Sequence, residues 1–94
     1  MQKEYYVSKW GSEQTNVTFY EVVKRTAKTI TLLEVRSYDF RTGDMTYRSV
    51  PSNKPAYNAT PQRYKLQEDG SVRIRSFERA RAWDGIAKNG TCYA

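Results

Sequence analysis

The groups in this sequence with the clearest chemistry are the cations of RYKLQEDGSVRIR, residues 63–75. The Glu-Asp-Gly triplet at residues 68–70 is typical of a three-residue turn between two β-strands. The resulting hairpin register has four facing pairs, Leu66 with Val72, Tyr64 with Ile74, Lys65 with Arg73, and Arg63 with Arg75. The two apolar pairs would face a core, whereas the two cationic pairs would oppose like charges, which destabilises a strand pair. The pattern therefore predicts that an anion bridges these cations.

Arginine remains frequent after the hairpin, in RIRSFERAR at residues 73–81. A guanidinium group makes planar, bidentate contacts with phosphate or carboxylate and stacks on bases. A surface that is merely solvated needs charge but not arginine, although solvation remains the alternative because salt screens exposed charges. The candidate residues for binding an anion, a nucleic acid or a partner are Arg63, Lys65, Arg73, Arg75, Arg79 and Arg81. Phe77 is a candidate for stacking on a base, whereas Trp83 is expected to pack in the core.

The net charge supports the same interpretation. The 94 residues carry 16 Lys and Arg against 10 Asp and Glu, which gives a formal charge of +6. Most of the excess lies in the second half of the chain, where the arginines are concentrated. Clustered positive potential attracts polyanions, phosphates or acidic protein patches.

Groups for catalysis and metal binding are scarce in this sequence. Histidine is absent, so the commonest general base and metal ligand is missing. Cys92 is the single cysteine, which excludes an internal disulfide and suits a reducing cytosol. We therefore expect a protein that is not an enzyme and that holds no metal or cofactor. No apolar run approaches the length of a membrane span and no signal-peptide core is visible, so we expect a cytoplasmic protein of a bacterial host cell, with no membrane partner.

The elements that must position the cations are expected to be short β-strands. Enrichment in β-branched and aromatic residues predicts strands at residues 5–10, 17–24, 29–38 and 45–50. Within residues 29–38 the apolar positions change face between Leu32 and Leu33, which indicates a bulge or a sharp bend. Several short strands without a helical period predict a single all-β domain over residues 1–94. The length favours a small SH3-like barrel, with an OB-like barrel as the alternative.

Three further segments complete the expected domain. All three prolines fall within residues 51–61, which predicts a loop there. Residues 88–94 are expected to form a loosely held tail. Residues 77–85 leave two options, a strand that continues from Val72 or one short C-terminal helix capped by Ser76. We favour the strand because isolated short helices are marginal.

A second segment, residues 10–32, resembles a group of small proteins encoded by phages, prophages and other mobile elements, whose hallmark is WGxxQTNxx(F/Y)YxV. The matching positions are Trp10, Gly11, Gln14, Thr15, Asn16, Phe19, Tyr20 and Val22. The group also carries an (R/K)IxS(F/Y) strand followed by WDG and a final YA, which match residues 73–77, 83–85 and 93–94 here. The resemblance therefore spans most of the chain.

This resemblance implies a mobile-element protein that binds host machinery, including defence nucleoproteins such as CRISPR effectors. An anti-CRISPR-like inhibitor would use its cations on guide RNA, target DNA or an acidic protein patch. The basic charge argues against mimicry of DNA, which needs an acidic surface. Two alternatives stay open, a phage nucleic-acid-binding barrel for replication, packaging or transcription, and a virion accessory protein whose charge is incidental.

The QTN segment itself has two interpretations. Gln14, Thr15 and Asn16 can hydrogen-bond the backbone of a loop that joins two strands. Alternatively the loop is exposed and recognises a partner, in which case Trp10 or Tyr20 would be a hot spot for binding.

Overall fold

The computed structural model describes residues 4–11, 16–43, 46–76 and 78–91, and the regular elements in these ranges are β-strands. The strands are β1 (Tyr5–Trp10), β2 (Asn16–Arg25), β3 (Thr29–Arg41), β4 (Thr46–Pro55), β5 (Gln62–Lys65), β6 (Val72–Arg75), β7 (Glu78–Ala82) and β8 (Lys88–Thr91). The predicted all-β class is confirmed. The described residues contain no helix, so the alternative of a short C-terminal helix is wrong, and they offer none that could span a membrane.

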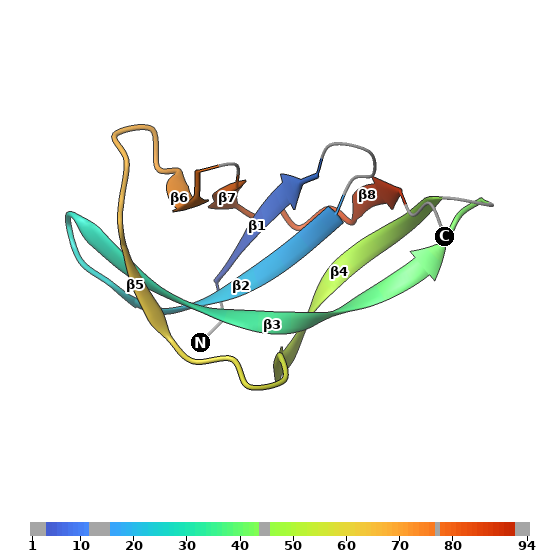
Figure 1. Cartoon of the computed structure of the whole chain (residues 1–94), viewed down its shortest axis with the longest axis horizontal. Helices are drawn as coiled ribbons and strands as arrows, with labels where there is room; N and C mark the ends of the chain where they lie inside the picture. The colour runs from blue at the N-terminus through green and yellow to red at the C-terminus, as the bar shows by residue number, and fades with distance from the viewer. Residues whose placement is uncertain (1–3, 12–15, 44–45, 77, 92–94) are drawn as a thin grey trace.

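The strands form one antiparallel sheet in the order β6-β7-β1-β2-β3-β4-β8, with β5 paired to β3 outside this path. The sheet curls, so that β6 and β7 lie across from β3 and β5 (Figure 1). The long strand β3 permits this shape because residues 29–32 pair with β5 whereas residues 35–41 pair with β4. Among the described residues, β5 and β6 meet only at the bridge between Leu66 and Val72, so the curled sheet is not closed.

Alternating side chains of the strands fill the inside of the curl. The buried core consists of Tyr6, Tyr20, Ile30, Leu32, Val72 and Ala80, with Val22, Tyr64, Leu66 and Ile74 packed against it. Because strand side chains alternate between faces, the residues next to these point to the other side of the sheet. There Phe19 is buried, and the Trp83 ring meets it edge-on at 5.8 Å. Trp83 thus packs against the fold, as the sequence predicts.

The bulge predicted between Leu32 and Leu33 is wrong, because these two residues pair in regular register with Val22 and Glu21, and the extra residues at the register shifts beside β3 belong to β2, at Val23, and to β4. The β2–β3 ladder shifts register between Val22 and Lys24, and the β3–β4 ladder shifts between Val35 and Ser37. Bulges of this kind bend a strand and increase its twist. Along its other edge, β3 pairs first with β5 and then with β4.

Two of the expected irregular segments contain strand. β4 runs through Pro51 to Pro55, so the predicted loop at residues 51–61 is wrong in its first half. Both prolines lie beside the register shift of the β3–β4 ladder, where a missing backbone N–H is tolerated. The expected tail is also wrong at Lys88–Thr91, because β8 pairs there with β4, and residues 92–94 lie outside the described residues.

The hairpin predicted at residues 63–75 is correct at its tip and wrong beyond it. Leu66 faces Val72, and Gly70 has the positive φ, 86°, that suits the turn. Beyond the bridge, β5 pairs with β3 and β6 pairs with β7, so the facing pairs Lys65–Arg73 and Arg63–Arg75 do not form. Each of these two strands instead pairs its backbone with another neighbour, which satisfies its hydrogen-bonding groups without the hairpin ladder.

Candidate anion-binding surface

Two arginines face each other in the ladder between β6 and β7. Arg73 pairs with Arg79, and both side chains are exposed. Arg81 follows two residues after Arg79 and lies on the same face, because the intervening Ala80 is fully buried in the core. We call Arg73, Arg79 and Arg81 the arginine row. The predicted opposition of like charges therefore exists, but in a different ladder.

The antiparallel pairing of β6 with β7 creates this arrangement. If the strand from Val72 had continued, Arg73 and Arg79 would lie six positions apart along one strand. Instead Arg75 faces Glu78 at the start of β7, and the two arginines become cross-strand neighbours. Facing residues of an antiparallel pair have Cβ atoms about 4.5–5.5 Å apart. One phosphate can therefore contact both guanidinium groups.

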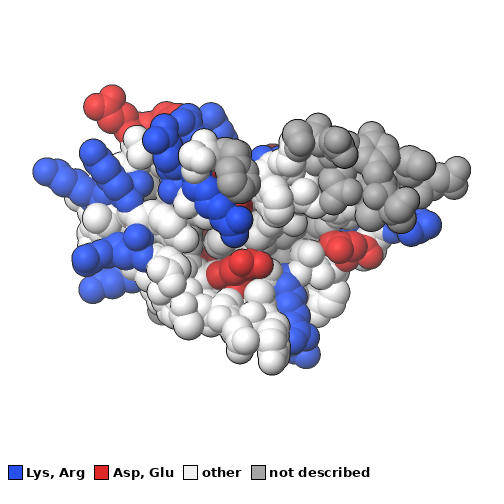
Figure 2. All heavy atoms as spheres, viewed as in Figure 1, with Lys and Arg blue, Asp and Glu red and all other residues white. Residues whose placement is uncertain are grey.

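Further cations surround the arginine row at one end of the molecule. Arg63 and Lys65 are exposed on β5. Arg63 lies opposite Thr31, whose other neighbour across the sheet is Lys24 of β2. The carbonyl of Lys28 accepts a 2.9 Å hydrogen bond from the amide that follows Lys65. Figure 2 shows Lys and Arg gathered over this end, where the β2–β3 turn and strands β5 to β7 lie.

Arg75 differs from the arginine row because it lies beside a buried acid. Glu78 is 2% exposed and accepts hydrogen bonds from Ser8 Oγ at 2.5 Å and from Tyr20 Oη at 2.7 Å. Arg75 Nε lies 3.6 Å from Glu78 Oε1. A buried carboxylate is costly unless it is paired and hydrogen-bonded, and these three groups supply the partners. The predicted role of Arg75 in binding an external anion is thus shared with a structural role.

Arg81 makes a weaker contact with an acid of the fold. Its Nη1 atom lies 4.0 Å from Asp69 Oδ2, and both side chains are more than half exposed. Exposed pairs of this kind contribute little. Asp69 chiefly shapes the β5–β6 turn, because it accepts hydrogen bonds from Ser71 Oγ at 2.6 Å and Ser71 N at 3.0 Å. These bonds hold the pKa of Asp69 below its usual value, the Ser71 hydroxyl having the largest effect.

Two of the aromatic candidates, Tyr20 and Trp10, pack against the fold. Tyr20 is 6% exposed, so its predicted role as an exposed hot spot is wrong. Trp10 is half-buried, and its Nε1 donates to Thr18 Oγ1 at 3.0 Å. Asn16 is the first residue of β2 and pairs with Trp10 of β1. Phe77, Gln14 and Thr15 lie outside the described residues.

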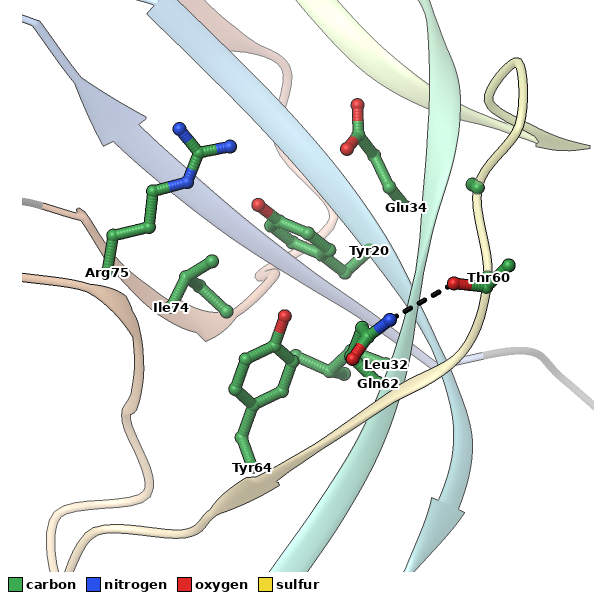
Figure 3. A pocket seen from close by; sticks show the side chains of 9 residues that line it. Tyr20, Leu32, Glu34, Thr60, Gln62, Tyr64, Ile74 and Arg75 are labelled. Atoms are coloured by element: carbon green, nitrogen blue, oxygen red, sulfur yellow. Dashed lines mark hydrogen bonds between the residues drawn. The ribbon is translucent and has the colours of Figure 1, made fainter.

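A hollow of ≈ 220 Å³ lies between β5 and β6, at the place where the sheet is not closed. Figure 3 shows Tyr64 of β5, Ile74 of β6 and Tyr20 of β2 around this space. Glu34 lines the same hollow from β3. Gln62 also belongs to its wall. The hollow thus combines aromatic walls with hydroxyl, amide and carboxylate groups.

Burial changes the acidity of both tyrosines in this hollow. The pKa of Tyr20 is raised far above its ordinary value of 10.0. Burial is the largest cause, and the hydrogen bond to Glu78 is the second. Burial is also the main cause of the raised pKa of Tyr64. Ionisation of Tyr20 would place two negative charges together in a buried site. The Tyr20 hydroxyl therefore remains protonated in the folded state through the alkaline range.

The raised pKa of Tyr20 predicts a specific alkaline destabilisation. Above about pH 10 the unfolded state releases the Tyr20 proton whereas the folded state keeps it, so stability falls as pH rises. The free energy of unfolding of the wild type should fall more steeply than that of Tyr20→Phe, by about 0.7 kcal/mol per pH unit at about pH 10 and by about 1.3 at about pH 11.5. Urea titrations at each pH measure this slope. Tyr57→Phe, at a side chain 85% exposed, should keep the wild-type slope. Equal slopes for the wild type and Tyr20→Phe would contradict the prediction.

Sequence patterns alone do not identify Glu78 as the centre of this region. In a short helix Glu78 would be an exposed residue of the first turn. In β7 its side chain instead points inward, on the same face of the strand as Ala80. Its neighbours Ser8 and Tyr20 come from β1 and β2, far away along the chain. The available signal is the alternation Glu78-Arg79-Ala80-Arg81, which places the acid on the same face as alanine.

The fold and this surface define an all-β protein with an arginine-rich face over one end of a curled sheet. Comparisons of the chain with protein-family models, with curated proteins and with solved structures found no match.

Proposed function

We propose that this protein is a non-catalytic binding protein that contacts phosphate groups of a host defence nucleoprotein through the arginine row and thereby inhibits it. The observation that carries the proposal is the direct opposition of Arg73 and Arg79 on an exposed face. A phosphate placed between them accepts charge-assisted hydrogen bonds from both groups and removes their repulsion. Arg81 extends the row toward a second phosphate.

The choice of a nucleoprotein as partner rests on the sequence. The WGxxQTNxx(F/Y)YxV segment resembles proteins of phages and other mobile elements, whose products commonly bind host machinery. A guide RNA or a bound DNA strand supplies the phosphates that the basic surface requires. The protein would act in the cytoplasm of the bacterial host.

The finer fold type belongs to the same proposal. We infer an SH3-like small barrel that is left open between β5 and β6. Around the curl the strands follow the order β6-β7-β1-β2-β3-β5. The first and last strands of this order, β6 and β5, come together at the Leu66–Val72 bridge. The ladders on both sides of β3 contain register shifts, with the extra residues on β2 and β4, and such irregularities support the bending that small barrels require.

Binding through the arginine row predicts a steep dependence on salt. Each phosphate contact releases counterions and contributes about −0.7 to −0.9 to the slope of log K against log salt concentration. Contacts with about three phosphates therefore give a slope of about −2 to −3. Titration of a fluorescently labelled protein with a purified RNA-guided effector complex at several salt concentrations measures it. A slope near zero would show that the arginines do not bind phosphate.

A comparison of three probes identifies the partner class. The probes are a bare single-stranded RNA, a bare duplex DNA, and the same RNA assembled in an effector complex. Tight binding to the complex alone, with loss of its nuclease activity, supports the proposal. Tight binding to naked RNA or DNA would instead support the nucleic-acid-binding barrel. Binding to none of them, together with presence in purified virions, would support a virion accessory protein.

A further inference from the structure

The gap between β5 and β6 exposes the edges of two strands to one another. β5 uses its other edge to pair with β3, and β6 uses its other edge to pair with β7. In the described part of the chain their only pairing is the Leu66–Val72 bridge. From that bridge the two strands diverge around the hollow that Figure 3 shows. Two strand edges that lack a neighbour are a template for an added strand.

On both strands beside the gap, aromatic or apolar side chains point inward and cations point outward. Tyr64 and Ile74 are partly buried and point inward, toward the core. The residues next to them, Arg63, Lys65 and Arg73, are exposed and point outward. Any strand inserted here would alternate in the same way. Its outward side chains would lie between cations of β5 and β6, and its inward side chains would enter the hollow.

We propose that the gap between β5 and β6 binds an extended acidic segment of a partner protein as an added strand. Main-chain hydrogen bonds to the free edges provide affinity, and the flanking cations select acidic residues at alternate, outward positions. The ≈ 220 Å³ hollow accommodates the inward side chains, and its hydroxyl, amide and carboxylate groups suit small polar ones such as threonine. Peptide binding at this gap is distinct from phosphate binding by the arginine row, although Arg73 borders both.

The direct test uses a peptide of roughly eight residues that alternates Glu and Thr, about the length of a strand. Amide hydrogen exchange of the protein is followed with and without this peptide. We expect exchange to slow by at least about tenfold on binding at those amides of β5 and β6 that point into the gap, whereas the alternate amides, which bond β3 and β7, should change little. A matched peptide N-methylated at alternate residues keeps its charges but lacks the donors for pairing. It should bind at least about tenfold more weakly.

Protein variants with the same charge change separate the gap from general electrostatics. Arg63→Glu, beside the gap, should weaken peptide binding at least about tenfold. Arg48→Glu, which lies on β4 opposite Phe40, should stay within about threefold of the wild type. Equal binding of the N-methylated peptide would overturn the proposal, as would protection of the same amides by bare RNA. Protection that rises with protein concentration without peptide would show instead that a second copy fills the gap. The nucleoprotein assays above report phosphate binding independently, because they do not depend on these amides.

Discussion

Glu78→Ala is expected to lower the free energy of unfolding by about 3–5 kcal/mol, a large fraction of the stability of a small domain. The substitution removes the acceptor for two buried hydroxyl groups, those of Ser8 and Tyr20. Each buried donor left without a partner costs about 1–3 kcal/mol. The lost carboxylate also leaves Arg75 without the acid that lies 3.6 Å from its Nε.

Urea denaturation followed by tryptophan fluorescence measures this loss, since Trp83 packs on Phe19 and Tyr5. Glu78→Gln retains one acceptor oxygen and should cost less, about 1–3 kcal/mol. Glu68→Ala removes an exposed carboxylate from the β5–β6 turn and should leave the midpoint unchanged. If Glu78→Ala unfolds at the wild-type urea concentration, the hydrogen bonds to Glu78 do not stabilise the fold.

The individual strands can be predicted from the sequence because their signals are local. The dense β-branched and aromatic residues of β2 and β3 specify strands without knowledge of their partners. The turn at Gly70 is equally local, and its register is correct at Leu66. The partner of each strand depends on contacts between distant segments. Nothing near Gln62–Lys65 in the chain indicates that β5 prefers β3 to β6.

The candidate site shows the same division. The abundance of arginine between residues 73 and 81 is visible in the sequence, and the basic face follows from it. The opposition of Arg73 and Arg79 requires β6 and β7 to pair antiparallel, and the sequence between them lacks the Asn-Gly or Asp-Gly signal that marks many hairpins. The inward position of Tyr20 beside Glu78 likewise depends on the pairing of β1 with β2 and β7. Sequence alone therefore predicts the composition of the surface but not which cations face each other.

Charge reversal of the arginine row should separate binding from stability. Arg79→Glu converts the facing pair from two cations to a cation and an anion, which should raise the free energy of unfolding by about 0.2–1 kcal/mol. Arg73→Glu combined with Arg79→Glu restores a like-charged pair, so its stability should return close to the wild-type value. Its affinity for the effector complex should fall at least about 100-fold, because two phosphate-binding groups become repulsive.

The matched control for this double variant is Arg36→Glu combined with Arg48→Glu, which makes the same change in net charge at exposed positions of β3 and β4. Long-range attraction alone would weaken both variants equally, whereas direct contact at the arginine row weakens only the first. Affinities measured at physiological salt, where the Debye length is about 8 Å, make this difference largest. Equal affinities of the two double variants would remove the arginine row as the binding site. Arg75 is left intact in this design because a second carboxylate beside the buried Glu78 would disturb the fold and obscure the result.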